Sequence, residues 1–253
     1  MNEYVHVRDP EKVTAYIEKW LASLVGKAGA RGIVVGLSGG IDSAVVAALA
    51  SRVFKDGALG VIMPCHSDPS DVTDALLVAG HLGMSHKTID LTPVFDVFTS
   101  GIDAEEPLSD MARANLKARL RMSALYGVAQ STSRLVCGTG NRSEWEVGYF
   151  TKHGDPASDL LPLLDLLKCE VRAVARFLGL PEVVINKAPT AGLWAGQTDE
   201  EEMGFSYDEL DGYLAAGEAA PENVRKIEAL RAKSEHKRLP VPACKIDLSQ
   251  NFL

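Results

Sequence analysis

Residues 32–49 read Gly-Ile-Val-Val-Gly-Leu-Ser-Gly-Gly-Ile-Asp-Ser-Ala-Val-Val-Ala-Ala-Leu. The apolar, β-branched run at 33–37 is typical of a fully buried parallel strand. Residues 38–40 predict a tight turn, and Asp42 and Ser43 then open an alanine-rich helix. The first N–H groups of such a helix lack backbone partners, and glycines allow a close approach. A strand, a glycine turn and a helix N-terminus therefore predict a site for phosphate oxygens.

The glycine turn differs from the two common phosphate-binding loops. A P-loop places a lysine directly after its last glycine, and no lysine follows Gly40. The dinucleotide fingerprint Gly-x-Gly-x-x-Gly fails at Gly36-Leu37-Ser38. The chain has Ser-Gly-Gly-x-Asp-Ser instead, and an aspartate beside a polyphosphate indicates a magnesium ion. The alternative is an ordinary glycine turn with a helix cap.

The composition is that of a folded, acidic protein. Of the 253 residues 46% are hydrophobic, which suffices for one large α/β domain or two small ones. The formal net charge is −8 and the pI is near 5.3. Broad nucleic-acid binding uses a basic face, so this charge argues against it. An anionic small substrate would need local basic groups.

The sequence indicates neither a membrane anchor nor a secretion signal. No run approaches the roughly 20 apolar residues of a membrane helix, and the first residues lack the layout of a signal peptide. The cysteines stand far apart, at Cys65, Cys137, Cys169 and Cys244, and form no Cys-x-x-Cys pair. Neither zinc nor a disulfide framework is suggested, and a reduced cytoplasmic protein is the simplest interpretation.

Strand and helix patterns alternate along the chain. Asp9-Pro10 reads as an N-cap followed by a first-turn proline, which predicts an opening helix. Buried strands are predicted at 33–37 and 58–63, and two further strands at 86–91 and 134–137. After the helix that Asp42 opens, further helices are predicted at 71–82, 93–101, 108–129, 168–179, 207–214 and 222–232. The alternation predicts an α/β fold: a single domain over 1–253, with an open parallel sheet and helices on both faces.

The segment after the fourth predicted strand belongs beside the glycine turn. In an open parallel sheet, ligands bind beyond the carboxyl ends of the strands, so residues 138–144 and 38–43 should face one crevice. Glu144 then becomes a second candidate metal carboxylate, and Thr139 a polar ligand for a phosphate or a base. An exposed surface acid is the alternative for Glu144.

Local positive charge is concentrated in two segments. In the helix predicted at 108–129, Arg113, Lys117 and Arg121 share one face, which is either solvated or turned toward a ligand. Residues 149–159 are too rich in Gly, Pro and Asp for a regular element, and they contain Lys152. The same stretch offers possible bases.

Two later segments complete the set. Residues 189–199 form a long loop of the kind that often acts as a lid, and Trp194 in it is either a hinge anchor or a ligand cover. His236-Lys237-Arg238 is a short basic cluster, which as a bare charge run would be a solvated surface.

Together these motifs resemble a known family. The loop Ser-Gly-Gly-Ile-Asp-Ser is similar to the pyrophosphate loop of the N-type ATP pyrophosphatases, which cleave ATP to AMP and pyrophosphate while activating an oxygen. Five further motifs occur in the order found in the NAD synthetases, over about residues 10–242; His153 stands where relatives often have tyrosine. The motifs are Asn115-x-Lys117-Ala118-Arg119-x-Arg121-Met122, Gly138-Thr139-Gly140-Asn141-x-Ser143-Glu144, Gly148-Tyr149-Phe150-Thr151-Lys152-x-Gly154-Asp155, Pro189-Thr190-Ala191-x-Leu193 and His236-Lys237-Arg238.

The resemblance implies an adenine nucleotide α-hydrolase-like, Rossmann-like fold and a ligase that forms a C–N bond. Because the motifs begin near residue 33, we expect no glutamine amidase domain and hence the ammonia-dependent reaction. In it deamido-NAD, ATP and ammonia give NAD, AMP and pyrophosphate through an adenylylated carboxylate, the last step of NAD biosynthesis. The resemblance also implies Mg²⁺ and a homodimer with deamido-NAD bound near the subunit interface.

Family positions assign a role to each candidate residue. Asp42 and Glu144 would coordinate Mg²⁺, and Lys168 would neutralise the phosphates. Asp155 and Asp159 are candidates to accept the proton of ammonium. The ATP-binding set is Gly36, Leu37, Ser38, Gly39, Gly40, Ile41, Asp42, Ser43, Thr139, Lys168 and Thr190. The deamido-NAD-binding set is Arg119, Lys152, Asp159, His236 and Lys237.

Two other functions stay open from the sequence. One is a different enzyme of the same superfamily, acting on tRNA or GMP, although such enzymes usually carry extra RNA-binding, dimerisation or amidase segments. The other is a nucleotide-binding sensor without catalysis. A sensor would need the phosphate turn but not Glu144, Lys168 and the 152–159 segment together.

Overall fold

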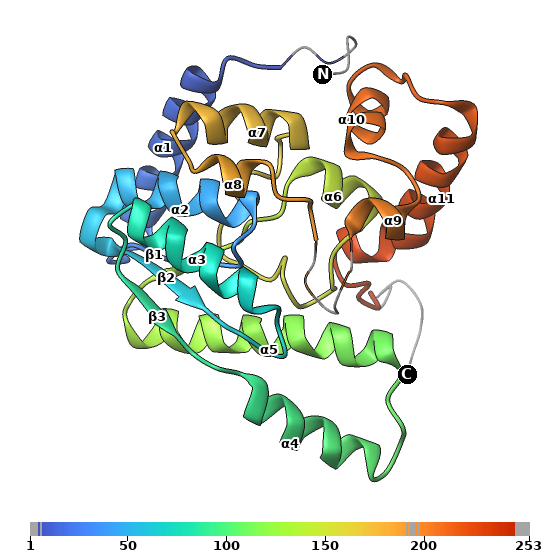
Figure 1. Cartoon of the computed structure of the whole chain (residues 1–253), viewed down its shortest axis with the longest axis horizontal. Coiled ribbons are helices and arrows are strands. Elements are labelled where there is room, and N and C mark those ends of the chain that lie inside the picture. The colour runs from blue at the N-terminus through green and yellow to red at the C-terminus, as the bar shows by residue number, and fades with distance from the viewer. Residues whose placement is uncertain (1–4, 6, 191, 193–195, 197, 246–253) are drawn as a thin grey trace, which may run out of the picture.

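Four parallel strands form the sheet at the centre of the molecule. The computed structural model describes residues 5, 7–190, 192, 196 and 198–245 (Figure 1). The strands lie in the order β3–β2–β1–β4, and Ile33 of β1 is in register with both Ala58 and Leu135. The strands are β1 (Ile33–Gly36), β2 (Ala58–Ile62), β3 (His86–Thr88) and β4 (Leu135–Cys137). The predicted open parallel sheet is confirmed.

The third strand is shorter than predicted, although its chain continues beside β2. Beyond Thr88, the N–H of Ile89 donates to the carbonyl oxygen of Ile62 (2.9 Å). The N–H of Leu91 donates to the carbonyl oxygen of Pro64 (2.8 Å). These bonds keep the two-residue spacing of a parallel ladder, but Pro64 has no N–H to donate in return. The regular pairing therefore ends at Thr88 while the contact persists.

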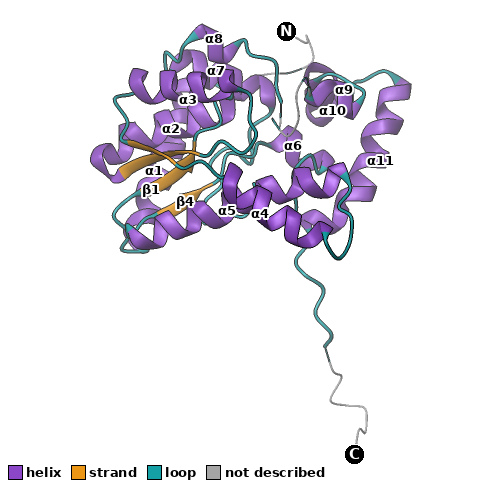
Figure 2. Ribbon diagram, turned by 60° about the horizontal axis from the view of Figure 1, so that its bottom comes forward, coloured by secondary structure: helices purple, strands orange, loops and turns teal. Residues whose placement is uncertain are grey.

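Helices cover both faces of the sheet, as predicted (Figure 2). Side chains alternate along each strand, so Ile33 and Val35 of β1 pack on one face and Val34 on the other. The first face lies under α2 and α3, with α1 and α7 packed against α2, and the second lies under α4 and α5. The helices are α1 (Pro10–Lys27), α2 (Ile41–Phe54), α3 (Pro69–His81), α4 (Thr92–Asp103), α5 (Asp110–Ser131), α6 (Arg142–Val147), α7 (Lys168–Phe177), α8 (Glu182–Ile185), α9 (Asp199–Met203), α10 (Tyr207–Ala216) and α11 (Pro221–Arg238), with a 3-10 turn at Lys55–Gly57.

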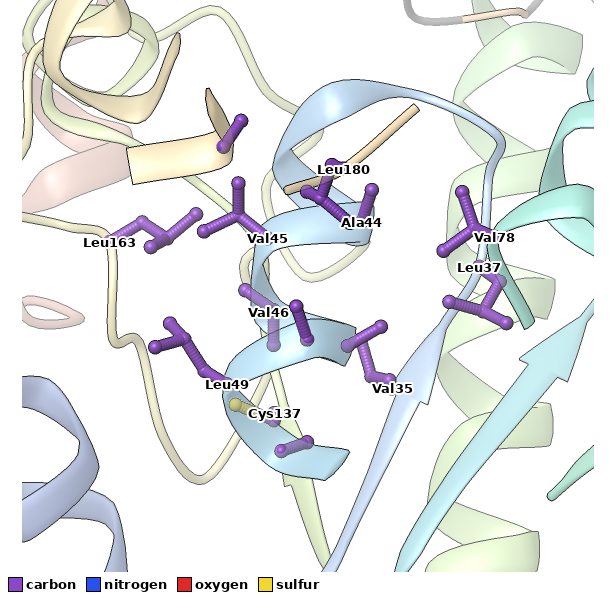
Figure 3. Close-up of a cluster of buried hydrophobic side chains, with 14 of the residues drawn as sticks. Val35, Leu37, Ala44, Val45, Val46, Leu49, Val78, Cys137, Leu163 and Leu180 are labelled. Carbon is purple, nitrogen blue, oxygen red and sulfur yellow. The ribbon is translucent and has the colours of Figure 1, made fainter. Parts of the chain in front are cut away.

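Helix α2 is the most buried helix of the fold. It has apolar residues on every side, and a helix of that kind is stable only when it is surrounded. Val45 and Leu49 are fully buried, and Figure 3 shows them among Val35 of β1 and Leu163 and Leu180 from later segments. This packing fixes the direction in which the N-terminus of α2 points.

The strand order creates the crevice expected from the sequence. From β1 the chain moves outward to β2 and then β3, and it later returns to β4 on the other side of β1. The loops that leave β1 and β4 therefore diverge. The carboxyl ends of these two strands are the usual place for a ligand in an open sheet of this type.

The C-terminal helices form a smaller core of their own beside the sheet. Met203, Phe205, Tyr207, Leu210 and Ile227 are buried there against Val147 of α6. Helices α6, α8 and α9 are not in the predicted set, because each has too few residues for helical periodicity to show. No helix in the described part of the chain combines the length and apolar character needed to cross a membrane.

Replacing Gly32 should disrupt the join between β1 and the turn before β2. A Cβ atom at this position would lie 2.1 Å from the carbonyl oxygen of Gly57, and backbone cannot yield cheaply. We expect Gly32→Ala to lower the free energy of unfolding by about 2–4 kcal/mol in urea titrations. The control is Gly26→Ala in α1, where a Cβ meets nothing within 4 Å. A Gly32→Ala variant as stable as the Gly26→Ala variant would contradict the steric argument.

Candidate active site

A cavity of about 630 Å³ opens at the carboxyl ends of β1, β2 and β4. Its wall combines the glycine turn with residues of α5, α6, α7 and α11 and of the segments between them. It thus collects most of the predicted site residues from distant parts of the sequence. Those in the wall are Gly36, Leu37, Ser38, Gly40, Ile41, Asp42, Ser43, Thr139, Glu144, Asp155, Lys168, Thr190, His236 and Lys237.

The glycine turn has the geometry of an anion site. Gly39 has φ +80°, and a Cβ there would lie 2.5 Å from the carbonyl oxygen of Asp71, so only glycine fits. The hydroxyl of Ser43 donates to the carbonyl oxygen of Gly40 (2.9 Å). Its oxygen also lies 3.1 Å from the hydroxyl oxygen of Ser38. No side chain caps the start of α2. Its first N–H groups therefore remain available to an anion in the cavity.

A buried lysine joins the two predicted metal carboxylates. Nζ of Lys168, the first residue of α7, donates to Oδ2 of Asp42 (2.6 Å) and to Oε1 of Glu144 (3.1 Å). Asn141 donates from Nδ2 to the other oxygen of Asp42 (2.9 Å). The lysine side chain is only 2% exposed. One ammonium group thus holds α2, α6 and α7 together at the cavity wall.

Burial and charge act in opposite directions on this cluster. Burial raises the pKa of Glu144 to about 7, and the neighbouring Lys168 opposes the rise. Burial would lower the pKa of Lys168, but the facing carboxylates of Asp42 and Glu144 raise it above its ordinary value. The lysine is therefore charged at neutral pH, and it reduces the repulsion between the two acids.

The donor set fits Mg²⁺ only in part. No group of three or more His, Cys, Asp or Glu side chains in the described ranges is arranged to hold a metal ion. Magnesium, however, is commonly bound by one or two carboxylates together with substrate phosphate oxygens and water. Asp42 and Glu144 supply two carboxylates beside a turn that is suited to binding phosphate. The site therefore fits Mg²⁺ when a phosphate group provides the remaining ligands.

Asp155 lies in the cavity wall, on the irregular segment predicted at 149–159. Its Oδ1 accepts a hydrogen bond from the N–H of Thr151 (2.9 Å). Burial raises the pKa of this carboxyl to about 6, while the bond from Thr151 and the charges of Lys237 and Arg121 oppose the rise. The side chain is also exposed to the solvent of the cavity, and an accessible carboxyl with a pKa of about 6 is suited to exchanging protons.

Three predicted substrate residues lie outside the cavity wall. The guanidinium of Arg119 donates to the carbonyl oxygen of Lys152 (3.3 Å), and Nζ of Lys152 donates to the carbonyl oxygen of His236 (2.6 Å). Asp159 accepts from the N–H of Val136 (2.8 Å) and the hydroxyl of Tyr126 (3.3 Å). Their assignment to deamido-NAD stays a prediction, and so does the covering role of Trp194, which is outside the described residues.

Sequence reasoning missed two residues of the charged cluster. Asp199 and Tyr207 are both buried, and the hydroxyl of Tyr207 donates to Oδ2 of Asp199 (2.9 Å). The ring of Tyr207 faces Nζ of Lys168, which lies 4.8 Å from the ring centroid. Neither residue had a signal in the sequence. The prediction placed Asp199 at the end of a loop and Tyr207 at the start of an ordinary helix.

Comparison with known proteins places the chain among NAD synthases. Residues 13–241 match the family described as NAD synthase. The ammonia-dependent NAD(+) synthetase of Carboxydothermus hydrogenoformans is 47% identical over 90% of this chain and 95% of its own. The structure of an NMN synthetase from Francisella tularensis is similar, with TM-score 0.90 and 37% identity, over 94% of this chain and 99% of that one. An ammonia-dependent NAD synthetase from Campylobacter jejuni has TM-score 0.80 and 30% identity, over 94% of this chain and 100% of its own.

The raised pKa of Asp155 predicts a pH-dependent stability. The folded chain keeps this proton up to pH about 6, whereas an ordinary aspartate has a pKa of 3.8. The folded state binds more protons between these values, so stability falls as pH rises. Because the side chain is exposed to solvent, we expect the fall to be no more than about 1 kcal/mol. Asp155→Asn should therefore gain stability relative to the unmodified chain over that range, measured by urea unfolding. A difference that does not change with pH would contradict the assignment.

Proposed function

The chain belongs to the NAD synthase family and has that family's ammonia-dependent activity, which converts deamido-NAD to NAD; we propose that the reaction takes place in the cavity around Lys168. The family's reaction uses ATP. The observation that carries the proposal is the contact of one buried ammonium with Asp42 and Glu144, directly beside the glycine turn. A nucleotide sensor would have no need of these buried charges.

The glycine turn holds the pyrophosphate part of ATP. The N–H groups at the start of α2 and the hydroxyl of Ser38 are its donors, and the positive end of the helix dipole favours the charge. Lys168, beside the turn, neutralises the phosphate oxygens. Thr139 and Thr190, both in the cavity wall, bind the nucleotide part.

Asp42 and Glu144 would hold Mg²⁺ together with phosphate oxygens. The bound ion would neutralise the charge that develops on the departing pyrophosphate. Apart from that contribution, the chain acts by positioning and by its own charges. Lys168 and the turn hold the phosphates on one side while the nicotinate carboxylate approaches the α-phosphate on the other.

The amidation requires an activated carboxylate. A nicotinate carboxylate cannot expel oxide, so transfer of AMP to it first creates a mixed anhydride with a good leaving group. Ammonia then attacks the carbonyl carbon, AMP departs, and one proton must be removed from the nitrogen. Asp155 accepts that proton, since it lines the cavity and its pKa is about 6. Asp159 is less suited, because its oxygens are held by Val136 and Tyr126 outside the cavity.

The protein works as a homodimer that pairs through α4. Val94, Val97 and Phe98 follow helical spacing and are exposed, whereas Phe95 on the opposite side packs on the sheet. Met111, at the start of the adjacent α5, is also exposed. Arg119, further along α5, then lies close to the pairing surface, where the outer part of deamido-NAD binds. A cytoplasmic location remains part of this proposal.

An assay of products tests the function. The chain is incubated with ATP, Mg²⁺, ammonium and deamido-NAD, and we expect NAD, AMP and pyrophosphate to form in equal amounts. Asp42→Asn should keep the fold but lose at least about a hundredfold in rate, as for the loss of a charged group that stabilises a transition state. Binding of ATP without product would instead favour the sensor.

The same assay compares two acids. Nicotinate mononucleotide is added in place of deamido-NAD, because the relative from Francisella tularensis is an NMN synthetase. We expect the dinucleotide to be amidated with the higher kcat/KM. A preference for the mononucleotide would contradict the assignment of the outer site to the dinucleotide.

A charge on the exposed face of α4 should separate the subunits. Val97 is 76% exposed, and Val97→Glu would place a carboxylate within an apolar interface. We expect the dimer dissociation constant to rise by about tenfold or more in analytical ultracentrifugation. Tyr16→Glu on α1 is the matched control, because Tyr16 is similarly exposed, at 73%, but lies on another face. Equal effects of both substitutions would contradict the assignment of α4.

A further inference from the structure

The ammonium of Lys168 lies where the two carboxylates would receive a metal ion. It contacts Oδ2 of Asp42 at 2.6 Å and Oε1 of Glu144 at 3.1 Å, so one cation already bridges both acids. The other oxygen of Asp42 accepts from Asn141. A divalent ion bound by the same two oxygens would stand beside this ammonium. The two cations would repel each other at carboxylates that are only 17% and 18% exposed.

If Lys168 leaves the two carboxylates, its positive charge needs another partner. Its side chain is 2% exposed, and a buried ammonium without a partner would be costly. Bound phosphates provide one counter-charge, but only after the nucleotide has entered. The chain therefore needs another acceptor close to Lys168 if the metal is to bind before or without the nucleotide.

Asp199 has the properties of that acceptor. It lies in the cavity wall and is 4% exposed, and its Oδ1 is a buried oxygen with no hydrogen-bond donor among the residues that the structure describes. Its Oδ2 accepts from Tyr207. The nearby hydroxyl of Tyr149 donates to Glu202 (2.8 Å). An ionised carboxylate with one unmatched buried oxygen is stabilised by a positively charged donor.

Tyr207 provides a path between the two positions. Its ring is fully buried and faces Nζ of Lys168, 4.8 Å from the ring centroid, and its hydroxyl reaches Asp199 at 2.9 Å. The same hydroxyl lies 3.5 Å from Oε1 of Glu144. The face of an aromatic ring attracts a cation, so an ammonium moving from Glu144 toward Asp199 would remain stabilised throughout.

We propose that Lys168 exchanges between two carboxylate partners: it neutralises Asp42 and Glu144 when no metal is bound, and it moves to Asp199 when Mg²⁺ takes those two acids before a nucleotide has bound. Asp199 is then a positioning residue that acts through Lys168, and Tyr207 guides the movement. The inference rests on the proposed metal site at Asp42 and Glu144. It makes metal binding weak in the absence of ATP, because the ion must displace an internal cation.

Metal affinity, measured without nucleotide, tests the exchange. Binding of Mn²⁺ in place of Mg²⁺ is followed by electron paramagnetic resonance for the unmodified chain, Lys168→Met, Asp199→Asn and the double variant. Lys168→Met removes the competing cation, so we expect Mn²⁺ to bind about tenfold more tightly or better. Asp199→Asn removes the alternative partner, so we expect Mn²⁺ to bind about threefold to tenfold more weakly.

The double variant separates positioning from direct ligation. If Asp199 acts through Lys168, Asp199→Asn has little effect once Lys168 is Met. If Asp199 binds the metal directly, Asp199→Asn weakens Mn²⁺ binding both when Lys168 is present and when it is Met. That result overturns the proposal. The proposal is also overturned if Asp199→Asn leaves the Mn²⁺ affinity unchanged in the presence and in the absence of Lys168. Asp71→Asn is the matched control, because Asp71 also lines the cavity and pairs with a lysine, Lys187 (2.8 Å); its Mn²⁺ affinity should change little.

Two further arms keep the result interpretable. Asp42→Asn should abolish measurable Mn²⁺ binding; if it does not, the metal site in the proposed function fails and the exchange fails with it. If Asp42→Asn does abolish Mn²⁺ binding, but Lys168→Met binds Mn²⁺ no more tightly than the unmodified chain, the metal site stands and only the exchange is wrong.

Folding of each variant is checked by circular dichroism and thermal melting. If Lys168→Met does not fold, Asp199→Asn decides, and unchanged affinity in it overturns the proposal.

Discussion

The buried ammonium of Lys168 is the interaction on which the site depends. It connects Asp42 at the start of α2 with Glu144 on α6, and its own backbone begins α7. These segments are brought together by packing, but their acids would repel one another if the lysine were absent. Breaking such a buried pair usually costs more than forming it gains, because the remaining charges have no compensation. The lysine therefore constrains the cavity wall as well as providing charge.

The surroundings of the lysine explain how a buried cation is tolerated. The hydroxyl of Ser143 accepts from the backbone N–H of Lys168 (3.0 Å) and donates to Asp211, so the start of α7 is fixed from behind. Tyr207 covers the ammonium with the face of its ring. The small C-terminal core thus supports the catalytic wall, although it makes no strand of the sheet. This accounts for the presence of α10 beside a site whose phosphate loop lies on α2.

The acidic net charge and the anionic substrates are compatible because basic groups are concentrated where they are needed. Lys168, Lys237 and Arg121 line the cavity, and Arg121 donates to the carbonyl oxygen of Met63 (3.1 Å), which fixes the segment after β2. Arg119 and Lys152 lie on the outer side of the same region. In the proposed function the two groups of basic residues bind the two ends of a long substrate, one beside ATP and one toward the surface where α4 is exposed.

The amino-acid sequence by itself determined the parallel sheet, most of its helices and the phosphate turn. Those features depend on local patterns: apolar runs for β1 and β2, Asp9-Pro10 for the start of α1, and a glycine turn that only Gly39 can make. The glycine turn and the segment after the fourth strand also pointed to Asp42 and Glu144, and the comparison with the family added the role of Lys168. Only the tertiary structure decided that Lys168 bridges both acids, that Arg119 and Asp159 lie outside the cavity, and that Asp199 and Tyr207 belong to the cluster. The physical reason is that a contact between residues far apart in sequence depends on how helices pack, and no periodicity or local motif records it.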